Sequence, residues 1–253
     1  MKIDDAIAAI KEFFLEVLGF LLPGFTLLLL SYLFMRDEVK EGIDSFLTKE
    51  HSSTIVLIVS YNLGYVLFGI SDAWHKYKKV GNPTWLFKFL RYCKLIEVKP
   101  FIEEVQDSIK KSPEYKVAIE IIHEKIGIEK DILESIGVNS VRNLAMSYVP
   151  EVDRKIYNFM FRSELSDKVN IAVKIILIFG FFSWLIEVTI GSYSLLKTDT
   201  TSLFIYFSFW PIAFFLRKTQ RRFFDIAWRI VFPIFVVKYK MQVEKKKEGN
   251  EQA

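Results

Sequence analysis

Residues 17–35 have the sequence VLGFLLPGFTLLLLSYLFM, a run of nineteen residues without a charge. A second uncharged run of eighteen residues, TIVLIVSYNLGYVLFGIS, occupies residues 54–71. An α-helix needs about 17–25 apolar residues to cross the hydrocarbon core of a bilayer. Neither run has the polar stripe that a helix in a soluble bundle keeps at every turn. Both runs are therefore predicted to be transmembrane helices.

Two further spans are predicted later in the chain. Residues 169–190 form one, with Lys174 and Glu187 expected near the two faces of the bilayer. Residues 200–216 form the other, a run of seventeen uncharged residues that ends at Arg217. The predicted fold class is an all-α polytopic membrane protein with four transmembrane helices.

The distribution of lysine and arginine predicts the orientation. Residues 72–168 carry seventeen of them and the tail from Arg217 carries ten, whereas the loops 36–53 and 191–199 carry three and one. Positive charges favour the cytoplasmic side of a membrane. We therefore expect an inner-membrane protein with both termini in the cytoplasm. Basic residues beside the span ends form a collar suited to anionic lipid headgroups: Lys76, Lys78, Lys79, Arg217, Lys218, Arg221 and Arg222.

The spans divide the chain into four expected parts. A transmembrane hairpin (1–71) is followed by a cytoplasmic α-helical module (72–168), a second hairpin (169–217) and a tail (218–253). The tail is predicted to form a basic helix over 221–240 that lies in the headgroup region, followed by a frayed end.

Within the module the sequence predicts several helices. One is expected over 84–98, and another starts at Pro113, after Ser112, and stops at Gly127 or Gly137. A third is expected to be capped by Asn139 or Ser140. A fourth follows Pro150 and runs straight into the third span.

Composition excludes several classes of function. The net charge of +4 with 51% hydrophobic residues is too apolar for disorder and argues against direct nucleic-acid binding. A single cysteine, Cys93, excludes an internal disulfide and multi-cysteine metal sites. The chain has no GxSxG, HExxH or P-loop motif. We therefore predict no enzyme activity and no cofactor.

One spacing resembles a metal-binding pattern. Asp72 with His75, and Glu120 with His123, place an acid and a histidine on one helix face. Carboxylate-bridged metal sites also need a glutamate from each of two further helices, and the sequence gives no sign of them. No metal site is predicted.

Inside the spans, a few residues are candidates for packing or movement. Ser60 and Gly64 form a small-x-x-x-small step that lets helices approach closely, and Asn62 could hydrogen-bond across such an interface. The step suits contacts within one protomer and contacts between protomers equally well. Pro23 with Gly24, and Pro211, are expected to kink their spans and could form a gate.

The order of these features resembles a class of small prokaryotic four-span membrane proteins. The resemblance rests on LLPGF (21–25), SYNLGYVL (60–67), the helical insert, and NFMFRSELS (158–166) before two more spans. Members of that class accompany soluble antiphage effectors. The resemblance implies no catalytic residue.

The resemblance and the topology together suggest a function in antiphage defence. The leading hypothesis is a homo-oligomer that perturbs membrane permeability when a partner engages the module. The alternative is an anchor that recruits a cytosolic partner protein to the inner membrane. The expected partners are membrane lipids, further copies of the chain and a cytosolic defence effector.

Overall fold

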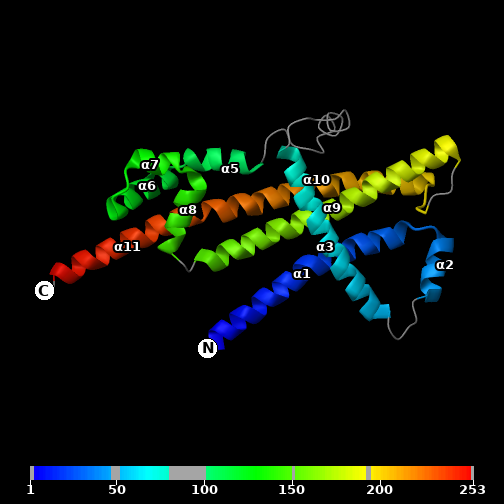
Figure 1. The fold of residues 1–253 in the computed structure, drawn as a ribbon, viewed down its shortest axis with the longest axis horizontal. Helices are drawn as coiled ribbons and strands as arrows, with labels where there is room; N and C mark the ends of the chain where they lie inside the picture. Colours follow the sequence, from blue (N-terminus) through cyan, green and yellow to red (C-terminus); the bar gives the residue numbers. More distant parts are fainter. Residues whose placement is uncertain (1–2, 47–51, 80–100, 150–151, 192–194, 252–253) are drawn as a thin grey trace. The chain divides into compact units, whose positions relative to one another are not determined.

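The computed structural model describes residues 3–46, 52–79, 101–149, 152–191 and 195–251, and its elements are helices (Figure 1). The all-α prediction is confirmed for these residues. The helices are α1 (Ile3–Phe34), α2 (Asp37–Phe46), α3 (Ser52–Lys79), α5 (Phe101–Lys110), α6 (Pro113–Ile126), α7 (Lys130–Ser135), α8 (Gly137–Ser147), α9 (Asp153–Ile190), α10 (Thr200–Arg229) and α11 (Val231–Glu251).

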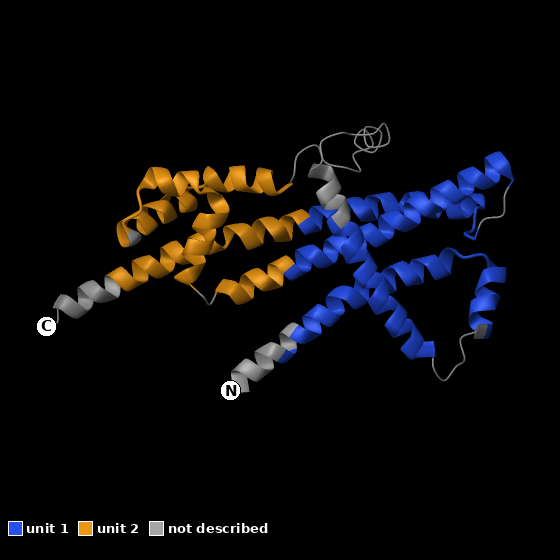
Figure 2. Cartoon of the chain, in the orientation of Figure 1, with its two compact units in different colours: residues 1–81, 161–220 blue, residues 82–160, 221–253 orange. Residues whose placement is uncertain are grey.

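The chain forms two compact units (Figure 2). Unit 1 consists of residues 1–81 and 161–220, and unit 2 of residues 82–160 and 221–253. Helices α9 and α10 each run without interruption through the residues at which the units divide. Each unit is described below by itself.

In unit 1, α1 and α3 cross where Gly24 of α1 faces Ser60 and Gly64 of α3. A Cβ atom added at Gly64 would lie 2.6 Å from the carbonyl carbon of Phe20, and one added at Gly24 would lie 2.6 Å from the amide nitrogen of Gly64. The Phe20 ring stacks on Tyr65, with centroids 4.5 Å apart. The two backbones therefore meet directly, as small residues in membrane helices allow.

The second hairpin of unit 1 pairs α9 with α10. Gly180 of α9 leaves room for the ring of Tyr206, because a Cβ at that position would lie about 2.6 Å from it. The rings of Phe181 and Phe207 also meet, with centroids 6.1 Å apart. Phe34 at the end of α1 completes a small buried cluster with Ile176 and Tyr206.

Three helices of the described residues are long and apolar enough to cross a membrane: Phe13–Phe34, Ser52–Asp72 and Asp153–Ile190. They include the first three predicted spans. The fourth, over 200–216, is not among them. Its seventeen uncharged residues include threonines, serines, a tyrosine and a proline, and Arg217 and Lys218 follow at once, so the apolar stretch is short for a span.

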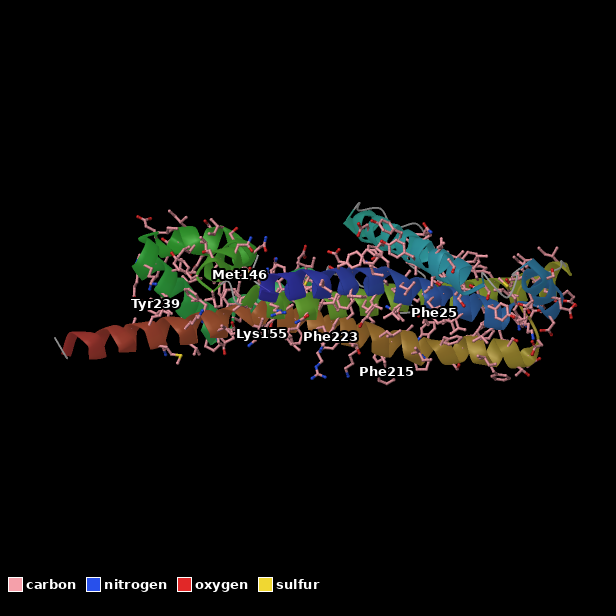
Figure 3. The ribbon with its side chains drawn as sticks, turned by 90° about the horizontal axis from the view of Figure 1, so that it is seen from below. Phe25, Met146, Lys155, Phe215, Phe223 and Tyr239 are labelled. Carbon is pink, nitrogen blue, oxygen red and sulfur yellow. The ribbon has the colours of Figure 1, made fainter. Side chains whose placement is uncertain are left out.

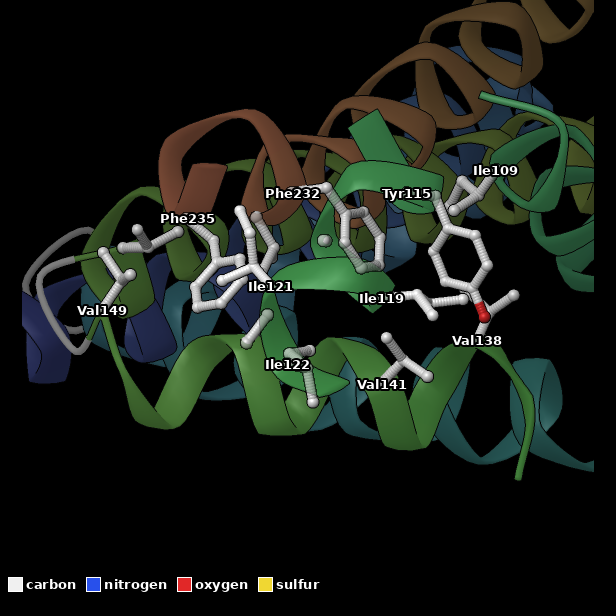
Figure 4. Packing of buried hydrophobic residues seen from close by; sticks show 14 of the residues in the cluster. Ile109, Tyr115, Ile119, Ile121, Ile122, Val138, Val141, Val149, Phe232 and Phe235 are labelled. Atoms are coloured by element: carbon white, nitrogen blue, oxygen red, sulfur yellow. The ribbon is translucent and has the colours of Figure 1, made fainter. Parts of the chain in front are cut away.

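Unit 2 has a hydrophobic core of its own, drawn from both of its chain segments (Figure 4). Helix α11 packs against α6 and α8. Phe232 of α11, which is 1% exposed, meets the Tyr115 ring edge to face at 5.2 Å between centroids. Phe235 is 2% exposed. These side chains lie in the protein core, which differs from the expectation that residues 221–240 rest in lipid headgroups.

Local signals explain the ends of several module helices. The Ser112 side chain caps α6, Pro113 occupies its first turn, and Gly127 ends it with a φ of 73°. This confirms the predicted start and the first of the two predicted stops. Helix α8 begins at Gly137 and is not capped by Asn139 or Ser140. Helix α9 runs from Asp153 to Ile190, which confirms that the helix after Pro150 continues into the third span.

Three other local expectations have different outcomes. The helix expected over 84–98 lies outside the described residues. The frayed end expected after residue 240 is instead part of α11 (Val231–Glu251), which is helical as far as Glu251. Residues 37–46 of the first predicted loop form α2, and the Tyr32 hydroxyl of α1 donates to the Asp44 carboxylate of α2 at 3.0 Å.

Candidate functional site

The most polar buried part of unit 1 is a network centred on Asp167 of α9. The Ser71 hydroxyl, at the end of the α3 span, donates to the Asp167 carboxylate at 2.8 Å. The Lys168 ammonium lies 3.4 Å from the same carboxylate and 4.4 Å from the centroid of the Phe68 ring. Asp167 is 9% exposed and Lys168 5% exposed. We call these four residues the Asp167 network.

Further charges surround the Asp167 network. Glu164, one turn before Lys168, lies within electrostatic reach of Asp72, Asp167 and Lys168. Burial lowers the pKa of the Arg217 guanidinium on α10, and the Asp167 carboxylate opposes that shift. The network therefore joins α3 to α9 through the Ser71 hydroxyl and the Phe68 ring, and joins α9 to α10 through the opposite charges of Asp167 and Arg217.

A second layer of polar contacts lies beside the network. The Asn170 amide, in the orientation that satisfies both of its polar atoms, donates to the Ala213 carbonyl at 3.1 Å and accepts from Lys174 at 3.2 Å. The Ser163 hydroxyl donates to the Gln220 carbonyl at 3.0 Å. These contacts hold α9 to α10 on the same side as the Asp167 network.

The substitution Asp167→Asn is expected to destabilise unit 1 by about 3 kcal/mol, because Lys168 stays buried after its carboxylate is lost. Adding Lys168→Met should recover most of the loss, since no uncompensated charge of the pair then remains. The thermal midpoint of the protein in mild detergent measures both effects. Equal stability of wild type and Asp167→Asn would contradict the assigned pairing.

A second network joins the other ends of the helices of unit 1. The Arg36 guanidinium bonds to the Glu187 carboxylate of α9, which also accepts from the Thr198 hydroxyl. The Lys197 ammonium lies 2.9 Å from the Asp37 carboxylate. Backbone bonds reinforce these pairs: the Arg36 amide donates to the Leu195 carbonyl at 3.1 Å, and the Lys197 amide donates to the Phe34 carbonyl at 2.7 Å. We call this the Arg36 network.

Other groups near the Arg36 network are also engaged within the chain. Asp199 caps α10, because its carboxylate accepts from the Ser202 amide at 3.2 Å and from the Ser202 hydroxyl at 2.6 Å. The Tyr206 hydroxyl donates to the Lys197 carbonyl at 2.9 Å. The Arg36 network lines a shallow groove of about 760 Å³ whose charged groups largely pair with one another.

The Asp37–Lys197 pair is expected to loosen at both extremes of pH. The hydrogen bond from Lys197, and then its charge, lower the pKa of the Asp37 carboxyl below its ordinary value, and the same hydrogen bond raises the pKa of Lys197. The carboxyl therefore contributes stability above about pH 4 that is lost as the pH falls through its lowered pKa. The ammonium contributes stability below about pH 10 that is lost as the pH rises through its raised pKa.

Hydrogen exchange at the Arg36 and Lys197 amides measures this pH dependence. Their protection factors should fall modestly below pH 4, because the pair is exposed to solvent. Lys197→Met should have low protection at neutral pH and little change on acidification. An acid-induced loss of the same size in Lys197→Met would contradict the assignment.

The histidine patterns do not come together with further ligands in the described residues. The ring of His123 contacts the Ile128 carbonyl at 2.6 Å, where it supports the end of α6. Glu120 lies 3.8 Å from Lys130. Asp72 is exposed, and His75 is not among the residues whose side chains the structure describes. No cluster of three or more His, Cys, Asp or Glu residues suited to a metal ion occurs in the described part.

The structure separates the three residues that the sequence groups around the small-x-x-x-small step. Ser60 and Gly64 are buried against α1 within the same chain. Asn62 faces outward, and its amide donates to the Ile58 carbonyl of its own helix at 2.8 Å. The step is thus occupied by an intramolecular contact, while Asn62 is left on the opposite side of α3.

The proline and collar residues lie in different surroundings. Pro23 and Gly24 are buried inside a continuous α1, and Pro211 lies exposed inside a continuous α10. Four collar residues lie on α10 in turn, all partly or fully exposed: Arg217, Lys218, Arg221 and Arg222. The other three lie at the end of α3, where the side chains are not described: Lys76, Lys78 and Lys79.

Lys174 and Glu187 are predicted from the sequence as single charges near the two faces of the bilayer. No role is predicted for Asp167, Lys168 or Arg36. The partners Ser71 and Asp167 are 96 residues apart and Arg36 and Glu187 are 151 apart, so no local spacing connects them. One usable signal is present: Asp167 and Lys168 immediately precede an apolar run. Charges at such a place are candidates for pairing.

Comparison of the chain with protein families, with curated proteins and with solved structures finds no match.

Proposed function

We propose that this protein is a multi-pass inner-membrane protein that holds a helical docking module at the cytoplasmic face of the membrane. The observation that carries the proposal is the contrast between the two units. In unit 1, large apolar side chains such as Phe13, Phe179 and Phe204 are more than 60% exposed. In unit 2, large apolar residues from two chain segments close around a core. Exposed apolar surface of that extent suits lipid, and a closed core suits water.

The proposal includes a fourth span at α10. Its outward face carries Phe204, Phe207, Phe214 and Phe215, each more than half exposed, and Figure 3 shows Phe215 on the outer surface of the helix. Its opposite face buries Ser202, Tyr206 and Ala213. A helix that turns these phenylalanines outward and keeps Ser202, Tyr206 and Ala213 inward is suited to a hydrocarbon environment. Snorkelling of Arg217 and Lys218 would help so short a span.

An anchor is supported better than a pore by the way the charges are used. Arg36 with Glu187, and Asp167 with Lys168, are engaged with partners in the same chain. The small-residue step at Ser60 and Gly64 is likewise occupied by α1. These groups therefore stabilise the protomer and are not left over to line a path for ions. Unit 2 is the part of the chain proposed to bind the cytosolic partner, because it is too large to be a simple connection between spans.

The resemblance to proteins that accompany antiphage effectors suggests the setting of this anchor. We propose that the cytosolic partner is such an effector and that the membrane location concentrates it there. Expression together with a soluble antiphage effector from the same genome should reduce phage plating, and expression of either protein alone should not. Equal protection without the membrane protein would contradict this role.

Topology is the first test of the anchor itself. In a Cys93→Ser background, Ser45→Cys in α2 and Ser135→Cys in unit 2 each place one thiol at an exposed serine. A membrane-impermeant maleimide should label Ser45→Cys in intact spheroplasts, and Ser135→Cys only after lysis. Labelling in the opposite order would overturn the orientation. Recovery of the protein in the soluble fraction would overturn the membrane assignment.

A further inference from the structure

Helix α3 has two seams of residues with the same spacing on opposite sides. Steps of four, three and four residues connect the buried seam, which is Ser60, Gly64, Leu67 and Ser71. The same steps connect an outward seam, which is Ile58, Asn62, Tyr65 and Gly69. This spacing keeps residues in line along a helix that packs against another helix at a shallow angle. The buried seam is already covered by the chain's own helices.

The outward seam places polar groups where lipid would surround them. Asn62 is the eleventh residue of the 21-residue candidate span Ser52–Asp72, so it lies at its midpoint. One amide hydrogen is used by the Ile58 carbonyl, and among the described residues the structure gives the Asn62 side-chain oxygen no donor. Polar side chains at that depth face other protein or water far more often than lipid.

The outward seam also has room for a close neighbour. At Gly69 an added Cβ would meet nothing within 4 Å, and this glycine is exposed. Ile58 and Tyr65 are 57% and 58% exposed, and the stack of Tyr65 on Phe20 holds its ring in place. Gly69 lies about two helical turns from Asn62. Together they offer close approach and hydrogen bonding, the two features that drive membrane helices together.

We propose that this seam is the contact between two copies of the chain, paired through α3. The inference rests on the proposed membrane location and deepens it. Two copies inserted with the same topology have parallel α3 helices, so a two-fold axis normal to the membrane sets Asn62 against Asn62. A primary amide both donates and accepts, so each Asn62 satisfies the other. Such self-complementarity is what a two-fold interface requires.

Cysteine cross-linking in native membranes tests the contact on the full-length chain. In the Cys93→Ser background, Ile58→Cys and Gly69→Cys leave Asn62 in place, and each is expected to give an oxidised band at twice the 29.7 kDa chain mass. Leu57→Cys is the matched control, because Leu57 is 52% exposed on the same helix but lies about 140° around it from Asn62. Equal cross-linking at Leu57→Cys, or none at the two seam positions, would overturn the contact.

A second variant tests the role of the amide. Combined with Gly69→Cys, Asn62→Leu should lower the cross-linked fraction at least fivefold, and Asn62→Gln should preserve most of it. No effect of Asn62→Leu would overturn the hydrogen-bonded contact. Cross-linking to a protein of different mass would overturn the choice of a second copy as occupant.

Alkaline carbonate extraction separates the two levels of the proposal. Release of the chain would overturn the membrane location on which the inference depends. Retention in the membrane without seam cross-linking would leave the anchor in place and overturn the α3 contact alone.

Discussion

Gly64→Ala is expected to destabilise the protein by about 3 kcal/mol or more, whereas Gly42→Ala in α2 is expected to be neutral or slightly stabilising. A Cβ at Gly64 would overlap the backbone of Phe20, and no side-chain rotation can relieve that overlap. The helices α1 and α3 would have to move apart along their whole contact. At Gly42 the added methyl enters open space and improves the helix propensity.

The thermal or detergent-induced unfolding midpoint of the purified protein measures this difference. Gly24→Ala should have a defect similar to that of Gly64→Ala, because the two glycines meet at the same crossing. Wild-type stability of both variants would mean that α1 and α3 do not approach this closely. Because the glycines act within one chain, their loss of function would not by itself indicate an oligomeric pore.

Phe232→Ala is expected to destabilise unit 2 by about 3–5 kcal/mol. The ring is 1% exposed and packs against Tyr115 in the core, so its removal loses buried apolar area and leaves a cavity. Val237→Ala is the control on the same helix. Val237 is 57% exposed, so its truncation should cost about 0.5 kcal/mol or less.

Protease resistance of unit 2 in the intact chain measures the effect of Phe232→Ala. The variant should be cleaved faster within 101–149, while cleavage in the spans should stay at the wild-type level. This result would distinguish a core position for α11 from a position in lipid headgroups. If α11 lay on the membrane, Phe232→Ala would weaken lipid association and leave the protease resistance of α6 and α8 unchanged.

Long apolar runs and local caps are readable from the sequence because their causes are local. An uncharged run of nineteen residues lacks the polar face that a helix in a soluble protein turns toward water. The α1 span could therefore be predicted from composition alone. Ser112, Pro113 and Gly127 satisfy or end the backbone of α6 through neighbours within a few residues. The continuation of α9 from the module into its span follows from the absence of proline and glycine over residues 153–179.

The use of each face of a helix was decided only by tertiary structure. The sequence shows Ser60, Asn62 and Gly64 as one motif, but the approach of α1 buries two of them and leaves the third outside. The basic and aromatic character of 221–240 is compatible with lipid, and only the core of unit 2 shows that α11 packs against α6 and α8.

The charges follow the same rule. Asp167, Lys168 and Arg36 are ordinary boundary charges in the sequence. The neighbours Asp167 and Lys168 become buried, and Arg36 meets Glu187, only when distant helices come together. The sequence by itself therefore determined that this chain is helical and which segments suit a membrane, because hydropathy and capping are properties of neighbouring residues. Which residues pair, and which remain for a partner, depends on contacts between residues that lie up to about 150 positions apart, and these exist only in the folded chain.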